Sequence, residues 1–103
     1  MVEAGNLQAA VAALETAREL RPSDDRILFR LAGLYYDLKR DAGARSYVEE
    51  AISLAPSQWL YHYLLGLIES RSGEKRLARA SLETALKLNP NASEVSKALQ
   101  DLQ

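Results

Sequence analysis

The stretch that decides the fold is Trp59 to Asn91, WLYHYLLGLIESRSGEKRLARASLETALKLNPN, which is the clearest copy of a unit that recurs along the chain. Its Pro90 sets the spacing of that unit, because Pro56 stands 34 residues earlier and Pro22 another 34 residues before it. The chain has no other proline. A fixed period of this length is typical of proteins in which stacked repeats pack only against their neighbours. The sequence therefore predicts a repeat array.

Apolar residues recur at fixed distances before each of these prolines. Alanines stand twelve and five residues before them, a leucine or valine stands eight before, and a leucine stands two before. Small residues at fixed points let two helices approach closely, while a larger apolar side chain fills the space beside them. The pattern predicts helical hairpins. The matching sets are Ala10, Ala44 and Ala78; Ala17, Ala51 and Ala85; Leu14, Val48 and Leu82; and Leu20, Leu54 and Leu88.

Apolar residues at spacings of three and four predict six helices and no strand, in one all-α domain. The turns between them are two to five residues long, which makes sequential helices pack antiparallel. Gly5 suits a left-handed turn before the first helix, and Asn91 with Glu94 resembles a capping box before the last. The oxygens of Ser23 to Asp25 can cap the second helix. The expected helices cover residues 6–20, 25–38, 42–54, 58–70 and 74–88, and a last helix ends near Leu102.

Composition excludes several classes of function. The 103 residues carry 13 basic and 14 acidic side chains, a net charge of -1, so no chain-wide attraction to nucleic acid or anionic lipid is expected. No cysteine is present, which removes disulfides and thiol chemistry. No apolar run approaches the roughly 18 to 20 residues of a membrane span, and the first residues do not read as a signal peptide. We expect a cytoplasmic protein with neither nucleic-acid nor membrane partners.

These residues resemble the tetratricopeptide repeat family, whose signature includes a Leu-Gly pair, an alanine, a large apolar residue and a proline. The resemblance implies a right-handed α-solenoid of antiparallel helix pairs over residues 1–103. It divides the chain into the second helix of a truncated unit (1–24), two full repeats (25–58 and 59–92) and a C-terminal capping helix (93–103). His62, Glu69 and Lys39 depart from the family pattern. The matching residues are Leu65-Gly66, Ala78, Leu82, Ala85 and Pro90 in one unit and Leu31-Ala32, Tyr35, Ala44, Val48, Ala51 and Pro56 in the other.

Nothing in the sequence has the spacing of a catalytic, metal or cofactor site. His62 is the only histidine, so a metal site would need carboxylates around one imidazole, and we interpret it as a packing residue. No nucleophile elbow, phosphate-binding glycine loop or paired carboxylates appear, so we expect no enzyme and no cofactor. The basic cluster Arg71, Lys75, Arg76 and Arg79 is interpreted as a solvated turn and outer helix face, because no aromatic residues interleave it to stack bases.

The resemblance also implies a function, since the first helix of each unit in this family lines a concave groove. An apolar face with a charged rim suits an extended peptide or a partner helix, so we expect a protein-protein interaction scaffold. One subclass grips a C-terminal carboxylate with lysine, asparagine and arginine. Gly33 and Leu67 stand where its asparagine would be, so that clamp is not expected. The groove residues are Arg26, Phe29, Arg30, Gly33, Tyr36, Leu60, Tyr63, Leu64, Leu67 and Arg71.

The N-terminal end suggests an alternative function. A repeat buries its apolar face only against its neighbours, so a lone second helix leaves Leu7, Val11 and Leu14 uncovered. Either the chain belongs to a longer array, or two copies associate through this edge as a homo-oligomeric assembly module. The last helix is polar on its outer side and is expected to be a cap.

Overall fold

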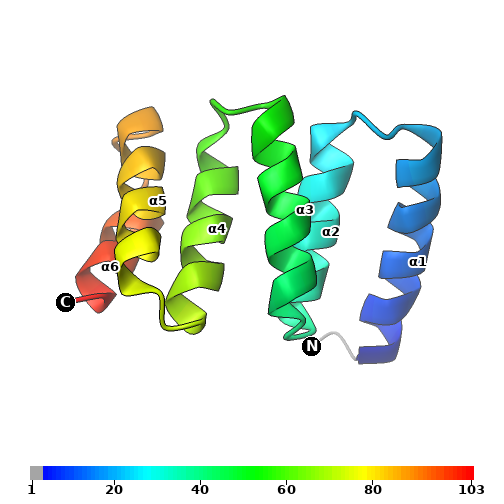
Figure 1. The fold of residues 1–103 in the computed structure, drawn as a ribbon, viewed down its shortest axis with the longest axis horizontal. Helices are drawn as coiled ribbons and strands as arrows, with labels where there is room; N and C mark the ends of the chain where they lie inside the picture. The colour runs from blue at the N-terminus through cyan, green and yellow to red at the C-terminus, as the bar shows by residue number, and fades with distance from the viewer. Residues whose placement is uncertain (1–3) are drawn as a thin grey trace.

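The computed structural model describes residues 4–103, which form six helices in a row and, within that range, no strand (Figure 1). The array begins with α1 at one end and finishes with α6 at the other, and successive helices run antiparallel. The predicted all-α class and helix number are confirmed, and the boundaries differ from the predicted ones by at most two residues. The helices are α1 (Ala4–Leu20), α2 (Asp25–Asp37), α3 (Asp41–Leu54), α4 (Trp59–Arg71), α5 (Lys75–Leu88) and α6 (Ser93–Asp101).

The two hairpins, α2 with α3 and α4 with α5, make the most extensive helix contacts, as the predicted repeats require. Their shared face is built from the small and large residues that recur before each proline. Gly66 marks the closest approach of α4 and α5, because a Cβ added there would lie 2.7 Å from Cγ of Leu82. The six residues of this face that belong to α3 and α5 are fully buried at 0% exposure: Ala44, Val48, Ala51, Ala78, Leu82 and Ala85.

The leucines two residues before each proline have a different role from these core positions. Leu20, Leu54 and Leu88 are 79%, 43% and 41% exposed, so their recurrence does not reflect burial in the core. They occupy the last turn of α1, α3 and α5, just before the chain bends toward the next unit. A periodic apolar residue therefore identifies an equivalent place in each repeat without showing that the place is buried.

Two turns share one backbone geometry, although one of them holds glycine and the other lysine. Lys39 has φ 61° and Gly73 has φ 81°, both in the left-handed region, and they stand one period apart. In each turn the two amides after the helix bond back to its last carbonyls, as in a Schellman motif. Arg40 N–H donates to the Tyr35 carbonyl at 2.8 Å, and Glu74 N–H donates to the Glu69 carbonyl at 2.9 Å. Lysine here keeps the turn that glycine forms more easily.

Two of the predicted helix ends are wrong. Gly5 lies inside α1 and not in a left-handed turn before it, since the helix already begins at Ala4. The capping box of Asn91 and Glu94 does not form, because the residue at the start of α6 is Ala92, which is 3% exposed and makes no side-chain cap. Packing of this alanine on the core decides where α6 begins. The expected cap of α2 is present, with Asp24 Oδ1 accepting from Arg26 N–H at 3.0 Å.

Candidate interaction surface

The predicted groove runs along α2 and α4, and the structure separates its residues by exposure. Leu60 is 40% exposed, and Arg26 and Arg30 are also exposed. Leu64 is 7% exposed and belongs to the hydrophobic core between the two repeats, so the expectation that it faces a partner is wrong. In that core it joins buried residues of α2 and α3. The half-buried members of the predicted set are Phe29, Gly33, Tyr36, Tyr63 and Leu67.

The aromatic residues of this surface also hold the array together. The ring of Phe29 packs on that of Tyr61 with centroids 4.8 Å apart, joining α2 to α4. Tyr63 lies 6.0 Å from Trp59, and both pack against the core cluster that includes α6. Burial, with the charge of Glu94 nearby, raises the pKa of Tyr63. Phe29 and Tyr63 are therefore only partly accessible to a partner.

Gly33 is placed differently from Gly66. A Cβ added at Gly33 would meet no atom within 4 Å, whereas one at Gly66 would meet Leu82. A mid-helix glycine costs about 1 kcal/mol relative to alanine. The open space above Gly33 shows that close packing within the chain does not require this glycine.

Arg71, predicted as a groove residue, is exposed but is held by contacts with the preceding repeat. Its guanidinium donates from Nε to Oδ2 of Asp41 at 3.0 Å and from Nη2 to the carbonyl of Tyr36 at 2.7 Å. It also lies 3.7 Å from the centroid of the Tyr36 ring, within cation-π range. The hydrogen bond from Arg71 lowers the pKa of Asp41 and raises that of Arg71 itself. The end of α4 is thus fastened to the turn between α2 and α3.

A second polar contact across the repeats was not predicted. Glu69 is 5% exposed, accepts a hydrogen bond from the Ser81 hydroxyl at 2.7 Å, and lies 3.8 Å from Nη2 of Arg45. The same guanidinium pairs with Glu74 at 2.5 Å. Burial raises the pKa of Glu69, and Ser81 and Arg45 oppose that rise. The sequence contained a signal for this contact, because Glu69 stands one period after Tyr35. A carboxylate that is buried at such a position needs a charged or hydrogen-bonding partner.

Tyrosine hydroxyls connect neighbouring helices in the same way. Tyr35 donates to Oε1 of Glu15 at 2.9 Å, and this bond, with burial, raises the pKa of Tyr35 to about 12. Tyr61 donates to Oδ2 of Asp25, and burial raises its pKa. These bonds join α1 to α2 and α2 to α4. Both of these tyrosine hydroxyls are therefore paired, as most buried polar groups are.

The N-terminal edge is more covered than the sequence predicted. Val11 is 8% exposed, so the expectation that it lies uncovered is wrong, because α1 packs this side chain against the rest of the array. Leu7 and Leu14 are half-buried. Leu14 lines a hollow between α1 and α2 together with Phe29, Arg30, Gly33, Leu34 and Asp37.

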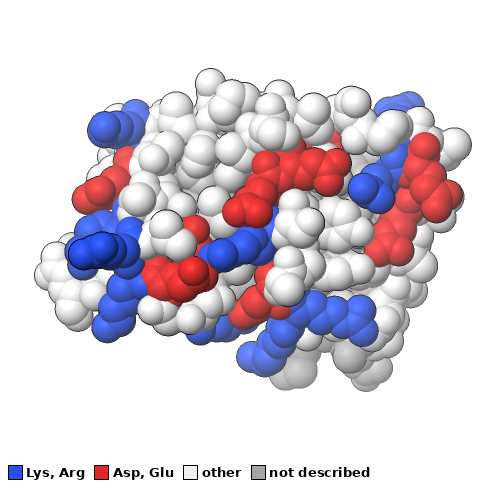
Figure 2. Space-filling view, viewed as in Figure 1, with Lys and Arg blue, Asp and Glu red and all other residues white. Residues whose placement is uncertain are grey.

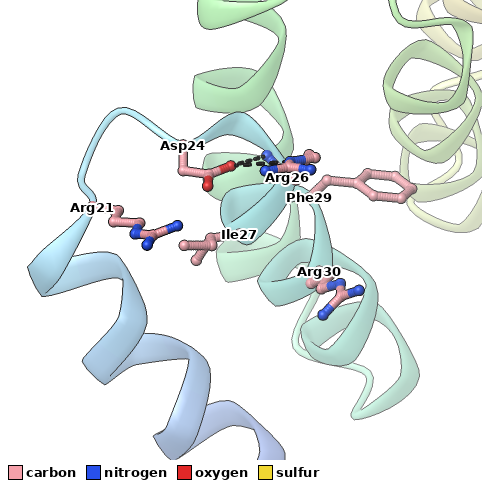
Figure 3. Close-up of a pocket in the computed structure, with 6 residues that line it drawn as sticks. All are labelled: Arg21, Asp24, Arg26, Ile27, Phe29 and Arg30. Carbon is pink, nitrogen blue, oxygen red and sulfur yellow. Dashed lines mark hydrogen bonds and ion pairs between the residues drawn. The ribbon is translucent and has the colours of Figure 1, made fainter.

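A second hollow opens at the start of α2. Figure 3 shows Arg21 reaching from the end of α1 toward Ile27 and Asp24, with Phe29 directed away toward the later helices. Arg26 and Arg30 complete its lining. The predicted groove residues Arg26, Phe29 and Arg30 therefore lie at the N-terminal end of the array.

Over the face shown in Figure 2, acidic and basic side chains are interspersed, and no broad area carries one sign. His62 lies half-buried with Nε2 2.8 Å from the carbonyl oxygen of Pro56. Between residues 4 and 103, no three histidine or acidic side chains gather as metal ligands would. None of the helices described has the length and apolar character needed to cross a bilayer.

A row of antiparallel helix pairs with a 34-residue period defines an α-solenoid. The chain belongs to the tetratricopeptide repeat family, which matches residues 1–68 and, in a second match, residues 59–92. This confirms the resemblance stated from the sequence. No curated protein matches the chain by sequence.

Solved structures with the same fold include two that carry peptides. The first tetratricopeptide domain of Spaghetti (RPAP3), bound to the HSP90 peptide SRMEEVD, superposes with a TM-score of 0.92 at 22% identity, covering 95% of this chain and 78% of that one. The Yersinia enterocolitica secretion chaperone SycD, in complex with a peptide of YopD, has a TM-score of 0.88 at 16% identity, with coverage of 95% and 80%. MamA has a TM-score of 0.89 at 21% identity, and this chain spans 57% of its length.

Proposed function

We propose that this chain is a non-enzymatic interaction scaffold that binds an extended peptide or a helix of a partner protein along α2 and α4. The single observation that supports it best is the placement of Leu60, which is 40% exposed on α4 beside the half-buried Tyr63 and Leu67. Three apolar side chains at spacings of three and four share one helical face. Apolar area left accessible in this way is typical of a contact surface.

Two further observations support the proposal. The open space above Gly33 leaves room on α2 for a partner's side chain or backbone. The relatives of known structure include two that hold peptides, RPAP3 with an HSP90 peptide and SycD with a YopD peptide. With Arg71 engaged by Asp41 and Leu64 buried, the proposed surface reduces to Leu60, Tyr63 and Leu67 on α4 and Phe29, Gly33 and Tyr36 on α2.

The test uses a matched pair of exposed leucines. Leu60→Glu places a charge on the proposed surface, and Leu77→Glu places the same charge on α5, where Leu77 is 48% exposed. A photo-crosslinker at position 67 captures partner segments from lysate, and the captured sequence is then synthesised and its affinity measured. We expect Leu60→Glu to weaken binding at least about tenfold and Leu77→Glu to leave it unchanged.

Equal affinity of the two variants would exclude this surface. Circular dichroism controls for folding, since both substitutions replace exposed side chains. Self-association through the N-terminal edge is the other function proposed from the sequence, and light scattering of the unmodified chain over a wide concentration range distinguishes it by the mass of the particle.

A further inference from the structure

The three repeat boundaries allow a direct comparison of residues that stand one period apart. Val48 and Leu82 are 0% exposed because α2 and α4 cover them, whereas the equivalent Leu14 is half-buried. The same holds on α2, where Ile27 and Leu34 are half-buried while their equivalents in α4, Tyr61 and Ile68, are 4% and 1% exposed. Ala10 and Ala17, one period before the buried Ala44 and Ala51, are also half-buried. Within residues 4–103, the surface that a helix covers in each later repeat is therefore only partly covered at this end.

The charges at this end identify what kind of helix fits it. Arg30 occupies the place of the buried Leu64, and in the described residues neither Arg30 nor Arg21 forms a side-chain ion pair or hydrogen bond. Arg26 has a side chain that is 80% exposed and lies 3.6 Å from Asp24. The hollow at the start of α2 is thus lined by three arginines, Arg21, Arg26 and Arg30, and by one aspartate, Asp24 (Figure 3). A helix that covered Arg30 without an acidic residue would bury an unpaired charge.

A second copy of this chain does not supply such a helix. The helices that cover the equivalent boundaries do so with a small residue, Ala32 in α2 and Gly66 in α4, and both are already buried. Gln100 of α6 stands one period after Gly66. At Gly66 even an added Cβ would lie 2.7 Å from Cγ of Leu82, so a glutamine side chain is too large for this position of the repeat. Gln100 therefore makes α6 a cap of the described array.

We infer that the two neighbouring hollows at this end are together a docking site for an acidic amphipathic helix of a partner protein, running parallel to α2. Leu14 and Leu34 line one hollow, Ile27 lines the other, and Arg30 lines both. In this parallel orientation the first turn of the partner helix lies near Arg26 and Arg30. Acidic residues in that first turn would pair with the arginines and are also favoured by the dipole of the partner helix itself. Its apolar residues cover Leu14 and Ile27. Asp37, about two turns further along α2 than Arg30, favours a basic residue near the partner's C-terminal end.

The probe is a fluorescein-labelled peptide with the sequence of residues 24–38, because α2 already covers the equivalent surface of the next repeat. The acidic form carries Arg26→Glu and Gly33→Glu, and the second of these lies one turn after Phe29, the residue that packs on Tyr61. The neutral form carries Gly33→Lys alone, which gives three acidic and three basic side chains. Both are titrated by fluorescence anisotropy with the complete chain and with its Arg30→Glu and Arg79→Glu variants. Arg79, exposed on α5 at the far end, is the matched control.

We expect the acidic peptide to bind the unmodified chain about tenfold more tightly than the neutral one, and we expect Arg30→Glu to reverse that order. Arg79→Glu should leave both affinities unchanged, and raising salt should weaken the acidic peptide. Leu60→Glu, which tests the surface of α4, should have no effect, so the two proposals fail separately.

Three results would overturn the inference. These are equal affinity for the two peptides, no binding of either, and the same loss for Arg79→Glu as for Arg30→Glu. A homodimer in light scattering that Arg30→Glu or Leu14→Gln dissociates would show that a second copy covers the two hollows, and would overturn the inference as well.

Discussion

Arg71 and Asp41 join two repeats across 30 residues of sequence, with Nε of the arginine donating to Oδ2 of the aspartate at 3.0 Å. The same guanidinium stacks on Tyr36 and bonds its carbonyl. Their side chains are 30% and 28% exposed, so solvent screens the pair only in part. Flat geometry and several donors make this contact specific to arginine.

Replacing Arg71 by lysine should therefore destabilise the array. Lysine keeps the charge but loses the stacking and the paired donors, and we expect about 1 kcal/mol of unfolding free energy to be lost. Urea denaturation followed by circular dichroism measures this. Arg76→Lys, an exposed arginine on α5, is the control and should change stability little.

Asp41→Asn should lose stability in a way that depends on pH. Because the hydrogen bond from Arg71 lowers the pKa of Asp41 in the folded chain, the aspartate stabilises the fold at neutral pH, and that contribution disappears as pH falls below about 4 through the folded pKa. The difference in unfolding free energy between the unmodified chain and Asp41→Asn should be largest at pH 7 and shrink toward pH 3. A constant difference would contradict this account.

Glu69 should show the opposite pH dependence. Burial raises its pKa in the folded chain, so protonation as pH falls from neutral toward about 4.3 favours the folded state. We expect Glu69→Gln, which keeps an acceptor for Ser81, to be at least as stable as the unmodified chain at pH 7. Thermal unfolding from pH 7 to pH 4.5 should show the unmodified chain gaining stability relative to this variant. The reverse trend would mean that the pairing with Arg45 outweighs burial.

The two helical glycines should respond in opposite ways to alanine. Gly33→Ala should raise the unfolding free energy by about 1 kcal/mol, because the added methyl group meets open space and alanine favours the helix. Gly66→Ala should lower it by about 1 to 2 kcal/mol, since the methyl group would collide with the fully buried Leu82. Chemical denaturation of both variants gives the comparison, and the same sign for both would refute it.

The turns at Lys39 and Gly73 allow a similar comparison of substitutions. Lys39→Gly should stabilise the chain by about 1 kcal/mol, because a residue with a Cβ is strained at φ 61° and glycine is not. Gly73→Ala should destabilise it by about the same amount, because φ is 81° there. Lys39→Ala serves as the control that removes the lysine charge without relieving the strain. If Lys39→Ala were as stable as Lys39→Gly, the gain in stability would come from loss of the lysine charge and not from relief of backbone strain.

Much of the fold followed from the residues alone, and the reasons are local. Pro56 and Pro90 end helices, Ala44 and Ala78 allow close packing, and their common period implies equivalent units. The misplaced features depended on non-local packing. The start of α6 follows the burial of Ala92 and not the capping residues beside it, and Leu54 recurs without being buried.

Sequence periodicity alone predicted the helical hairpins and their number, because a repeat encodes its own packing within 34 residues, and the resemblance of the signature residues gave the family. Which side chains remain free for a partner depended on how one unit lies on the next. Leu64 is buried and Arg71 is held by Asp41 because α4 packs against the preceding repeat. Arg30, one period before Leu64, is exposed because no described helix covers it. Contacts between residues 30 or more apart are set by the stacking of units, which only the tertiary structure specifies.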